Sequence, residues 1–327
     1  MKKTLLTNYY PPREAIAPYL EQMDFIMPSA DQVEFSRSQV LELLPQADAL
    51  WRVGLTLPVD REMIQAGPRL QAIGTLSVGY NDIDWRYAAA QNIPVINTPH
   101  TVTEATAELA VALMLAAMRS LPRQDSQLRR SGRLSFSYFD SFSTRAYGKT
   151  LGLVGFGRIG RAVARKARGL GMKVVYFDPL RADAALEQEA AATYLPFEQL
   201  LRQADVVSLH LPQTPETVGL FGAEQFALMK PTAYFINAAR GGLVQEAELA
   251  RALAEGRLRG AGLDVYQEEP LIHPALLSLD NVVLAPHVGT WTADTRIEMA
   301  HEVLDGIAEV FRGRLPDNLV NRELLPR

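Results

Sequence analysis

The sequence predicts an α/β protein built from parallel sheets flanked by helices. Short apolar segments alternate with helical patterns along most of the chain, which is typical of parallel α/β architecture. The 327 residues correspond to about two domains at roughly 150 residues each. Hydrophobic residues make up 48% of the chain and charged residues 21%, which is the balance of an ordinary globular protein.

The first third of the chain has the pattern of one compact α/β unit. Proline residues separate its segments, as expected at the joints between elements. We expect strands at residues 3–7, 49–53, 70–75 and 93–97, and helices at residues 13–19, 37–44 and 82–91.

A long helix is expected next, at residues 103–120, with Thr101 or Thr103 as its N-cap and Pro122 marking its end. It is apolar on nearly all faces from Leu109 on, so we expect it to be buried in a core or at a subunit interface. Residues 131–144 lack clear periodicity and are rich in Ser, Tyr and Phe, which predicts a long loop.

From Lys149 on, the alternation becomes cleaner. Six strands with intervening helices predict a doubly wound domain of the kind that binds a dinucleotide. The strands are expected at residues 150–155, 173–178, 206–211, 233–238, 260–265 and 282–285, and the helices at residues 159–170, 197–202, 223–229 and 245–255. A final amphipathic helix is expected at residues 292–312.

The glycine-rich turn after the first of these strands predicts a phosphate site. It has the pattern Gly-x-Gly-x-x-Gly, with Gly155 for a tight turn, Gly157 for close approach of a pyrophosphate and Gly160 for helix packing. The N-terminus of the following helix favours the phosphate charge. The next strand ends in Asp178, which is placed to bind the ribose hydroxyls and favours NAD(H) over NADP(H). Arg181 follows and could accept a 2′-phosphate, so NADP(H) stays the less favoured alternative.

Composition excludes several other chemistries. The chain has no cysteine, which removes disulfides, thiol nucleophiles, Fe–S clusters and thiolate metal sites. The net charge of −4 does not indicate a nucleic-acid partner, and residues 1–10 lack the apolar core of a signal peptide. The most apolar stretch, residues 109–118, is shorter than the roughly 20 residues that a membrane span needs. We therefore expect a cytoplasmic protein with no metal, nucleic-acid partner or membrane association.

Four motifs follow one another in an order that is more specific than any of them alone. They are the glycine turn, Asn-Ala-Ala-Arg-Gly-Gly at residues 237–242, Gly-Leu-Asp-Val-Tyr-Gln-Glu-Glu-Pro at residues 262–270, and Pro-His-Val-Gly at residues 286–289. Together they resemble the D-isomer-specific 2-hydroxyacid dehydrogenase family, and residues 74–84 resemble its substrate loop. The resemblance implies NAD(H)-dependent interconversion of a small 2-keto acid and a D-2-hydroxy acid. It also implies a Rossmann domain inserted into a flavodoxin-like substrate domain.

Three residues of these motifs suit the chemistry of such a reaction. Singly, an arginine beside two glycines is typical of a surface turn and a glutamate before proline is typical of a solvated loop; their joint order favours function. His287 is predicted to be the acid–base residue. Glu269 would orient it and favour its protonated form, and Arg240 would bind the substrate carboxylate and polarise the carbonyl. The remaining histidines, His100, His273 and His301, are predicted to be structural, and His210 to line the cofactor.

The resemblance implies further binding residues. It places Leu76, Ser77, Val78 and Gly79 at the substrate, with the amides of the last two at its carboxylate, and Asp264 near the nicotinamide carboxamide. The predicted cofactor-binding residues are Thr106, Gly155, Gly157, Arg158, Ile159, Gly160, Asp178, His210, Pro212, Thr217, Asn237, Ala238, Asp264, His287 and Gly289.

We expect the dinucleotide domain at residues 99–286 and the substrate domain at residues 1–98 and 287–327, with the reaction in the cleft between them and a homodimer as the assembly. The similarity is greatest to glyoxylate, hydroxypyruvate and 2-ketogluconate reductases. A D-lactate-type or D-3-phosphoglycerate dehydrogenase is an alternative. Residues 76–80 contain no basic cluster that could bind the phosphate of phosphoglycerate. A corepressor-like protein that senses NAD is an alternative of another class. Residues 130–140 and Trp291 depart from the family pattern and leave the substrate side chain open.

Overall fold

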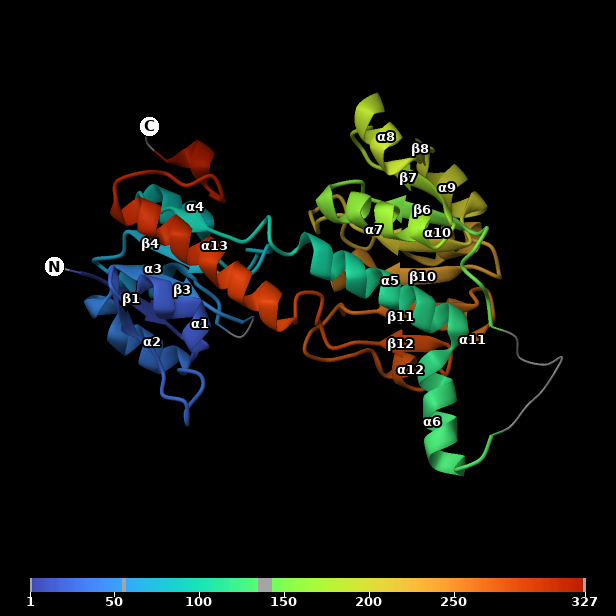
Figure 1. Ribbon diagram of the computed structural model, residues 1–327, viewed down its shortest axis with the longest axis horizontal. Helices are drawn as coiled ribbons and strands as arrows, with labels where there is room; N and C mark the ends of the chain where they lie inside the picture. Colours follow the sequence, from blue (N-terminus) through green and yellow to red (C-terminus); the bar gives the residue numbers. More distant parts are fainter. Residues whose placement is uncertain (1, 55–56, 135–142, 326–327) are drawn as a thin grey trace. The chain divides into compact units, whose positions relative to one another are not determined.

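The computed structural model describes residues 2–54, 57–134 and 143–325. The chain divides into two compact units, the first formed by Met1–Val102 with Thr290–Arg327 and the second by Thr103–Gly289. Figure 1 shows the elements of each. The crossings between the units fall a few residues after the predicted domain boundaries, which lay at residues 98/99 and 286/287.

The first unit has a parallel sheet with the strand order β2-β1-β3-β4-β5 among its described residues. This is the flavodoxin-like order. Its strands are β1 (Lys3–Thr7), β2 (Met23–Ile26), β3 (Ala49–Arg52), β4 (Ala72–Thr75) and β5 (Val95–Ile96). The edge strand β2 was not predicted; only its first residue is fully buried, so it lacks a clear apolar run.

Helices flank this sheet, and the C-terminal helix α13 is one of them. Gly74 of β4 leaves the room that Val303 and Ile307 of α13 fill, so the end of the chain completes the core of the first unit. The helices are α1 (Arg13–Ile16), η1 (Ala17–Tyr19), α2 (Arg37–Leu43), η2 (Leu44–Gln46), α3 (Arg61–Ala66), α4 (Trp85–Ala90), α13 (Ala293–Phe311) and η4 (Arg322–Leu324).

The second unit has a parallel sheet with the order β12-β11-β10-β9-β6-β7-β8 in the described chain. This is the Rossmann order with one further strand, so the predicted fold class is confirmed. The prediction of six strands missed β8, a three-residue edge strand. The strands are β6 (Thr150–Val154), β7 (Lys173–Phe177), β8 (Ala192–Tyr194), β9 (Val206–Leu209), β10 (Tyr234–Asn237), β11 (Gly260–Leu263) and β12 (Val282–Leu284).

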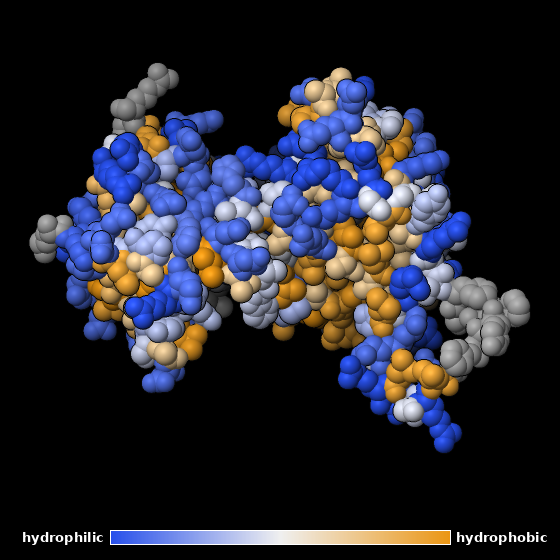
Figure 2. Space-filling view, viewed as in Figure 1, coloured by the Kyte–Doolittle hydropathy of each residue, from blue (hydrophilic) through white to orange (hydrophobic). Residues whose placement is uncertain are grey.

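The long helix α5 (Thr103–Arg119) lies on this sheet, with Leu113 close to Gly262 of β11. Figure 2 shows apolar surface over α5, where Leu109, Val111 and Leu115 stay partly exposed, so the helix is not buried on all sides. The remaining helices are α6 (Leu121–Ser131), α7 (Arg158–Gly169), α8 (Ala184–Ala190), α9 (Phe197–Gln203), α10 (Ala223–Leu228), η3 (Gly241–Leu243), α11 (Glu246–Ala254) and α12 (Pro274–Leu277).

Helix α6 was not predicted. Pro122 was expected to end a helix, but it lies in the first turn of a new one, where its missing N–H costs no hydrogen bond. The break between α5 and α6 is at Ser120, whose φ is 51°. Within the described residues no single helix is long and apolar enough to span a membrane; α5 and α6 meet that criterion only as a pair bent by 59°. Residues 135–142 of the predicted loop lie outside the described residues.

Candidate active site

The predicted site residues of the second unit gather at the carboxyl edge of its sheet. The glycine turn follows β6, Asp178 follows β7, His210 follows β9, Arg240 follows β10, Glu269 follows β11 and His287 follows β12. Strands β6 and β9 are neighbours, and the strand order reverses between them. Ligands of open α/β sheets bind beside the carboxyl ends of the strands at such a switch point.

The glycine turn has the geometry of a phosphate cradle. Gly155 has a φ of 100°, and a Cβ there would come within 2.6 Å of the His210 backbone. A Cβ on Gly160 would collide with the carbonyl oxygen of Gly155. At Gly157, by contrast, a Cβ would meet no described heavy atom within 4 Å. The first and third glycines therefore serve the fold, whereas the second leaves space for a ligand at the start of α7.

Both carboxylate oxygens of Asp178 accept a backbone hydrogen bond, one of them from the glycine turn. The Phe156 amide donates to Oδ2 at 2.8 Å, and the Leu180 amide donates to Oδ1 at 3.1 Å. These bonds fix the carboxylate beside the glycine turn, and each oxygen retains acceptor capacity for a ribose hydroxyl. The described residues therefore fit a dinucleotide bound in the manner of a Rossmann domain.

His210 lies against the same turn with one ring nitrogen unused. Its Nε2 is 2.9 Å from the Ser208 hydroxyl oxygen. Its Nδ1 is buried and has no hydrogen-bond partner among the described residues, although the residue as a whole keeps partial exposure. Burial lowers the pKa of His210 to about 4, so the ring is neutral near pH 7 and unsuited to donating a proton there. A buried polar atom without a partner is rare in folded proteins, and it agrees with the predicted place of His210 beside a cofactor.

Arg240 is held by a small loop after β10. The Asn237 side chain donates to the Arg240 carbonyl at 2.9 Å and accepts from the Ala239 amide at 3.0 Å. The Arg240 Nη1 donates to the Ala239 carbonyl at 2.7 Å. Burial lowers the pKa of Arg240, while the charge of Glu269 opposes this shift. The Asn237 side chain thus shapes the loop that carries the arginine.

Glu269 and His287 form a direct pair. The Nδ1 atom of His287 is 2.8 Å from Oε2 of Glu269, and the Tyr266 amide donates to Oε1 at 3.0 Å. Burial alone would raise the pKa of Glu269, but the hydrogen bonds from His287 and Tyr266, with the charge of Arg240, bring it below its usual range. Glu269 is therefore ionised and orients the ring. Nε2 of His287 has no partner among the described residues and is available to a substrate.

The backbone of His287 is strained, with a φ of 54° in a region that non-glycine residues seldom occupy. The His287 amide donates to the Asp264 carbonyl at 2.8 Å, and the amides of Val288 and Gly289 donate to the Asp264 carboxylate at 2.8 and 2.9 Å. Burial raises the pKa of Asp264, against these two hydrogen bonds. Asp264 thus secures the loop that carries the His287 ring; such strain persists where the surroundings determine it and is common at active sites.

The predicted substrate loop belongs to the first unit, where its carbonyls are turned toward the protein. The Thr98 amide donates to the Ser77 carbonyl at 3.1 Å, the Asn97 side chain to the Val78 carbonyl at 2.9 Å, and the Ser77 hydroxyl to the Gly79 carbonyl at 2.5 Å. In the described part of the chain nothing accepts from the amides of Val78 and Gly79. Such unpaired successive amides suit a carboxylate.

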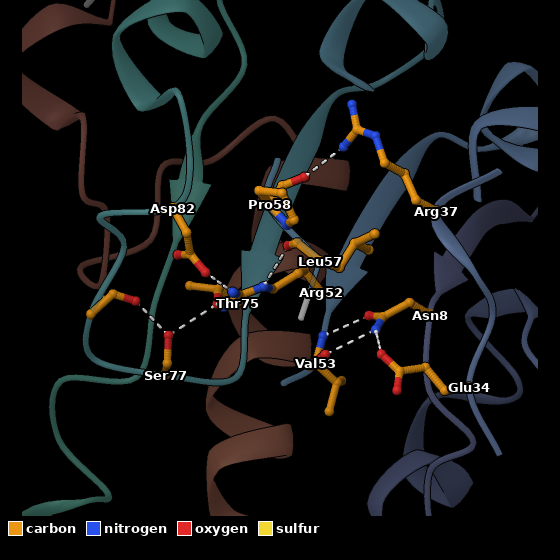
Figure 3. A network of polar contacts seen from close by, with 11 residues as sticks. Asn8, Glu34, Arg37, Arg52, Val53, Leu57, Pro58, Thr75, Ser77 and Asp82 are labelled. Atoms are coloured by element: carbon orange, nitrogen blue, oxygen red, sulfur yellow. Dashed lines mark hydrogen bonds and ion pairs between the residues drawn. The ribbon is translucent and has the colours of Figure 1, made fainter. Parts of the chain in front are cut away.

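Sequence reasoning missed Arg52, which braces this loop (Figure 3). Its side chain is fully buried, and its Nη1 donates to the Thr75 hydroxyl at 3.1 Å. That hydroxyl lies 3.1 Å from Ser77 Oγ, while the guanidinium also forms an ion pair with Asp82 near the end of the loop. Burial lowers the pKa of Arg52 to about 10, so it remains a cation. No local pattern marks Arg52, because the side chains that it contacts, those of Thr75 and Asp82, are distant along the chain.

The remaining predicted cofactor residues keep that assignment as a prediction. Thr106 is buried near Gly289. The Thr217 hydroxyl donates to the Pro212 carbonyl at 2.8 Å and accepts from the Thr214 amide at 2.8 Å, which closes the turn after β9. Trp291 is 66% exposed in the first unit.

A dinucleotide turn with an arginine, a glutamate and a histidine at the ends of three adjacent strands defines a nicotinamide-dependent oxidoreductase. Residues 111–289 match the family model of the D-isomer specific 2-hydroxyacid dehydrogenase, NAD binding domain. The chain belongs to the D-isomer-specific 2-hydroxyacid dehydrogenase family.

Relatives of known name cover nearly the whole chain. A glyoxylate reductase of Korarchaeum cryptofilum is 41% identical over 90% of this chain and 89% of its own length, and one of Thermococcus litoralis is 42% identical over 88% of each. The crystal structure of a glyoxylate reductase from Paecilomyes thermophila is 32% identical, with a TM-score of 0.86 over 98% of this chain and 99% of that one. An NADPH-dependent glyoxylate/hydroxypyruvate reductase from Sinorhizobium meliloti is 28% identical, with a TM-score of 0.84 over 100% and 99%.

Proposed function

We propose that this dehydrogenase uses NADH to reduce glyoxylate and hydroxypyruvate to the corresponding 2-hydroxy acids, with 2-ketogluconate as a larger candidate substrate. The observation that carries the reaction type is the 2.8 Å pair between Glu269 and His287 Nδ1, which leaves the opposite ring nitrogen for the substrate. The names of the relatives support the substrate class.

Each of the three side chains has a separate role in the proposed reaction. The glycine turn and Asp178 would hold the dinucleotide, whose nicotinamide would supply the hydride for C2 of the keto acid. His287 supplies a proton from Nε2 to the carbonyl oxygen, so that one hydride and one proton complete the alcohol. Glu269 stabilises the protonated ring before transfer. Arg240 binds the carboxylate through its planar donors and polarises the carbonyl.

A substrate panel tests this proposal directly. Oxidation of NADH is followed at 340 nm with glyoxylate, hydroxypyruvate, pyruvate, 2-ketogluconate and branched 2-keto acids. We expect the highest kcat/KM with glyoxylate or hydroxypyruvate. Highest efficiency with a branched keto acid or pyruvate would contradict the proposed substrates, and inactivity with every keto acid would contradict the reaction type.

The proposal includes a preference for NAD(H), which rests on Asp178. We expect Asp178→Ala to lower the ratio of kcat/KM for NADH over NADPH by about tenfold or more, because charged hydrogen bonds of about 1.5–3 kcal/mol to the ribose are lost and repulsion of a 2′-phosphate disappears. Asp178→Asn keeps one acceptor oxygen, which can accept from the Phe156 amide of the turn, so it removes the charge with less damage to the turn than alanine. An unchanged ratio in both variants would refute this use of Asp178.

We also propose that the amides of Val78 and Gly79 bind the substrate carboxylate. Ser77→Ala removes the hydroxyl that holds the Gly79 carbonyl. The lost hydrogen bond corresponds to an increase of about threefold to tenfold in KM for the keto acid, whereas the Kd for NADH should not change. Steady-state kinetics and NADH fluorescence titration measure the two quantities. A change in the Kd for NADH with no change in KM would count against this role.

A further inference from the structure

In the segment after strand β7, the guanidinium of Arg181 is paired with the carboxylate of Glu187. Its Nε donates to Oε1 of Glu187 at 2.8 Å, and its Nη2 donates to Oε2 at 3.1 Å. The contact is therefore two-pronged, which is the geometry in which an arginine is best held by a carboxylate. Arg181 is the basic residue of the segment 178–187 that follows the ribose-binding end of the strand.

Glu187 is the fixed partner of this pair. Its side chain is 17% exposed, whereas that of Arg181 is 63% exposed. The Tyr176 hydroxyl donates to Glu187 Oε1 at 2.7 Å and accepts from the Ala182 amide at 3.1 Å. The Tyr176 ring in turn stacks on Phe156 of the glycine turn, with 3.9 Å between the ring centroids. Glu187 and Asp178 are therefore both linked to Phe156, the first through Tyr176 and the second through the Phe156 amide.

The position of this pair bears on the choice of cofactor. In Rossmann domains an acidic residue at the end of the second strand binds the ribose hydroxyls of NAD, whereas a nearby arginine accommodates the 2′-phosphate of NADP. Here the acidic residue is Asp178 and the arginine is Arg181. An arginine that is already paired with a carboxylate must give up that contact before it can bind a phosphate.

We propose that Glu187 is a selectivity-determining residue, which holds the Arg181 guanidinium away from a 2′-phosphate and thereby favours NAD(H) over NADP(H). Glu187 acts through Arg181 and is a positioning residue. The inference rests on the proposed preference for NAD(H) and adds a second determinant to Asp178.

The test measures binding of reduced cofactors without turnover, by fluorescence titration of the whole protein with NADPH and NADH. Glu187→Gln keeps an acceptor for Tyr176 but removes the charge that holds Arg181. We expect its Kd for NADPH to fall by about threefold to tenfold, since partly exposed ion pairs contribute modestly, while the Kd for NADH stays unchanged. Glu189→Gln removes the same charge from the same helix and should leave both values unchanged.

The arginine is tested separately. Arg181→Ala alone should leave the Kd for NADPH unchanged, and in the double variant with Glu187→Gln it should abolish the gain. An equal gain in Glu189→Gln, or a gain that survives loss of Arg181, would assign the effect to net charge and overturn the inference. If Glu187→Gln does not tighten NADPH although the wild-type protein binds NADH more tightly, the inference fails and the proposed preference stands. Tighter wild-type binding of NADPH would refute both.

Discussion

Replacement of His287 by asparagine is expected to lower turnover of every accepted keto acid by about 10²–10⁴-fold, the usual contribution of a general acid–base residue, while NADH binds as before. Asparagine is the substitution least disturbing to the loop. It tolerates the left-handed conformation that His287 adopts at a φ of 54°, and its side-chain amide can replace Nδ1 as a donor to Glu269. What it lacks is a second nitrogen that can deliver a proton.

The matched control is His273→Asn in the same unit. His273 caps helix α12, with its Nδ1 3.3 Å from the Ala275 amide, and asparagine is also a good N-cap. That variant should keep both turnover and NADH binding. Activity of the His287 variant within a few-fold of the wild-type value, measured by NADH oxidation, would remove His287 from its assigned role. Loss of NADH binding in that variant would indicate damage to the loop instead.

Local sequence patterns predicted the elements whose own residues show a clear apolar period and a clear boundary. The glycine turn, the strand that ends at Asp178 and the long helix α5 each combine a periodic apolar pattern with a recognisable boundary. Helix α6 and strand β8 were missed because a proline within a first turn resembles a helix end, and because a three-residue edge strand has too few residues to show a period. The order of the four motifs, together with a family resemblance, predicted roles for Arg240, Glu269 and His287, which the structure places after the neighbouring strands β10, β11 and β12.

Contacts between distant residues could not be predicted in the same way. Arg52 meets Asp82, and Asn97 meets Val78, only once strands β3, β4 and β5 lie side by side. From the sequence, Arg181 could likewise accept a phosphate. In the fold, Arg181 lies before α8 and forms an ion pair with Glu187 of that helix. Such pairings depend on register and loop path, and neither is encoded in a single local pattern.

Replacement of Arg240 by lysine should have an effect comparable to that of losing His287, but on a different kinetic constant. Lysine preserves the charge and loses the planar pair of donors. Loss of one or two charged hydrogen bonds of about 1.5–3 kcal/mol each corresponds to a decrease of about 10–10⁴-fold in kcat/KM. We expect much of this loss in KM for the keto acid, because the carboxylate is bound before and during the reaction, and no change in the Kd for NADH.

Rescue by a small cation separates this role from a structural one. Arg240→Ala leaves a space beside Glu269, and added guanidinium ion should restore part of its activity with saturable dependence, as a ligand for the same carboxylate. Arg251→Lys, on the exposed face of α11 where Arg251 pairs with Glu248, provides the matched control and should behave as the wild-type protein. If Arg240→Lys keeps kcat/KM near the wild-type value, or if guanidinium raises the activity of both Ala and wild-type proteins equally, the carboxylate is bound elsewhere. Because Asn237 holds the Arg240 backbone rather than its side chain, the loop itself should survive these substitutions, so an altered KM reports on the lost guanidinium.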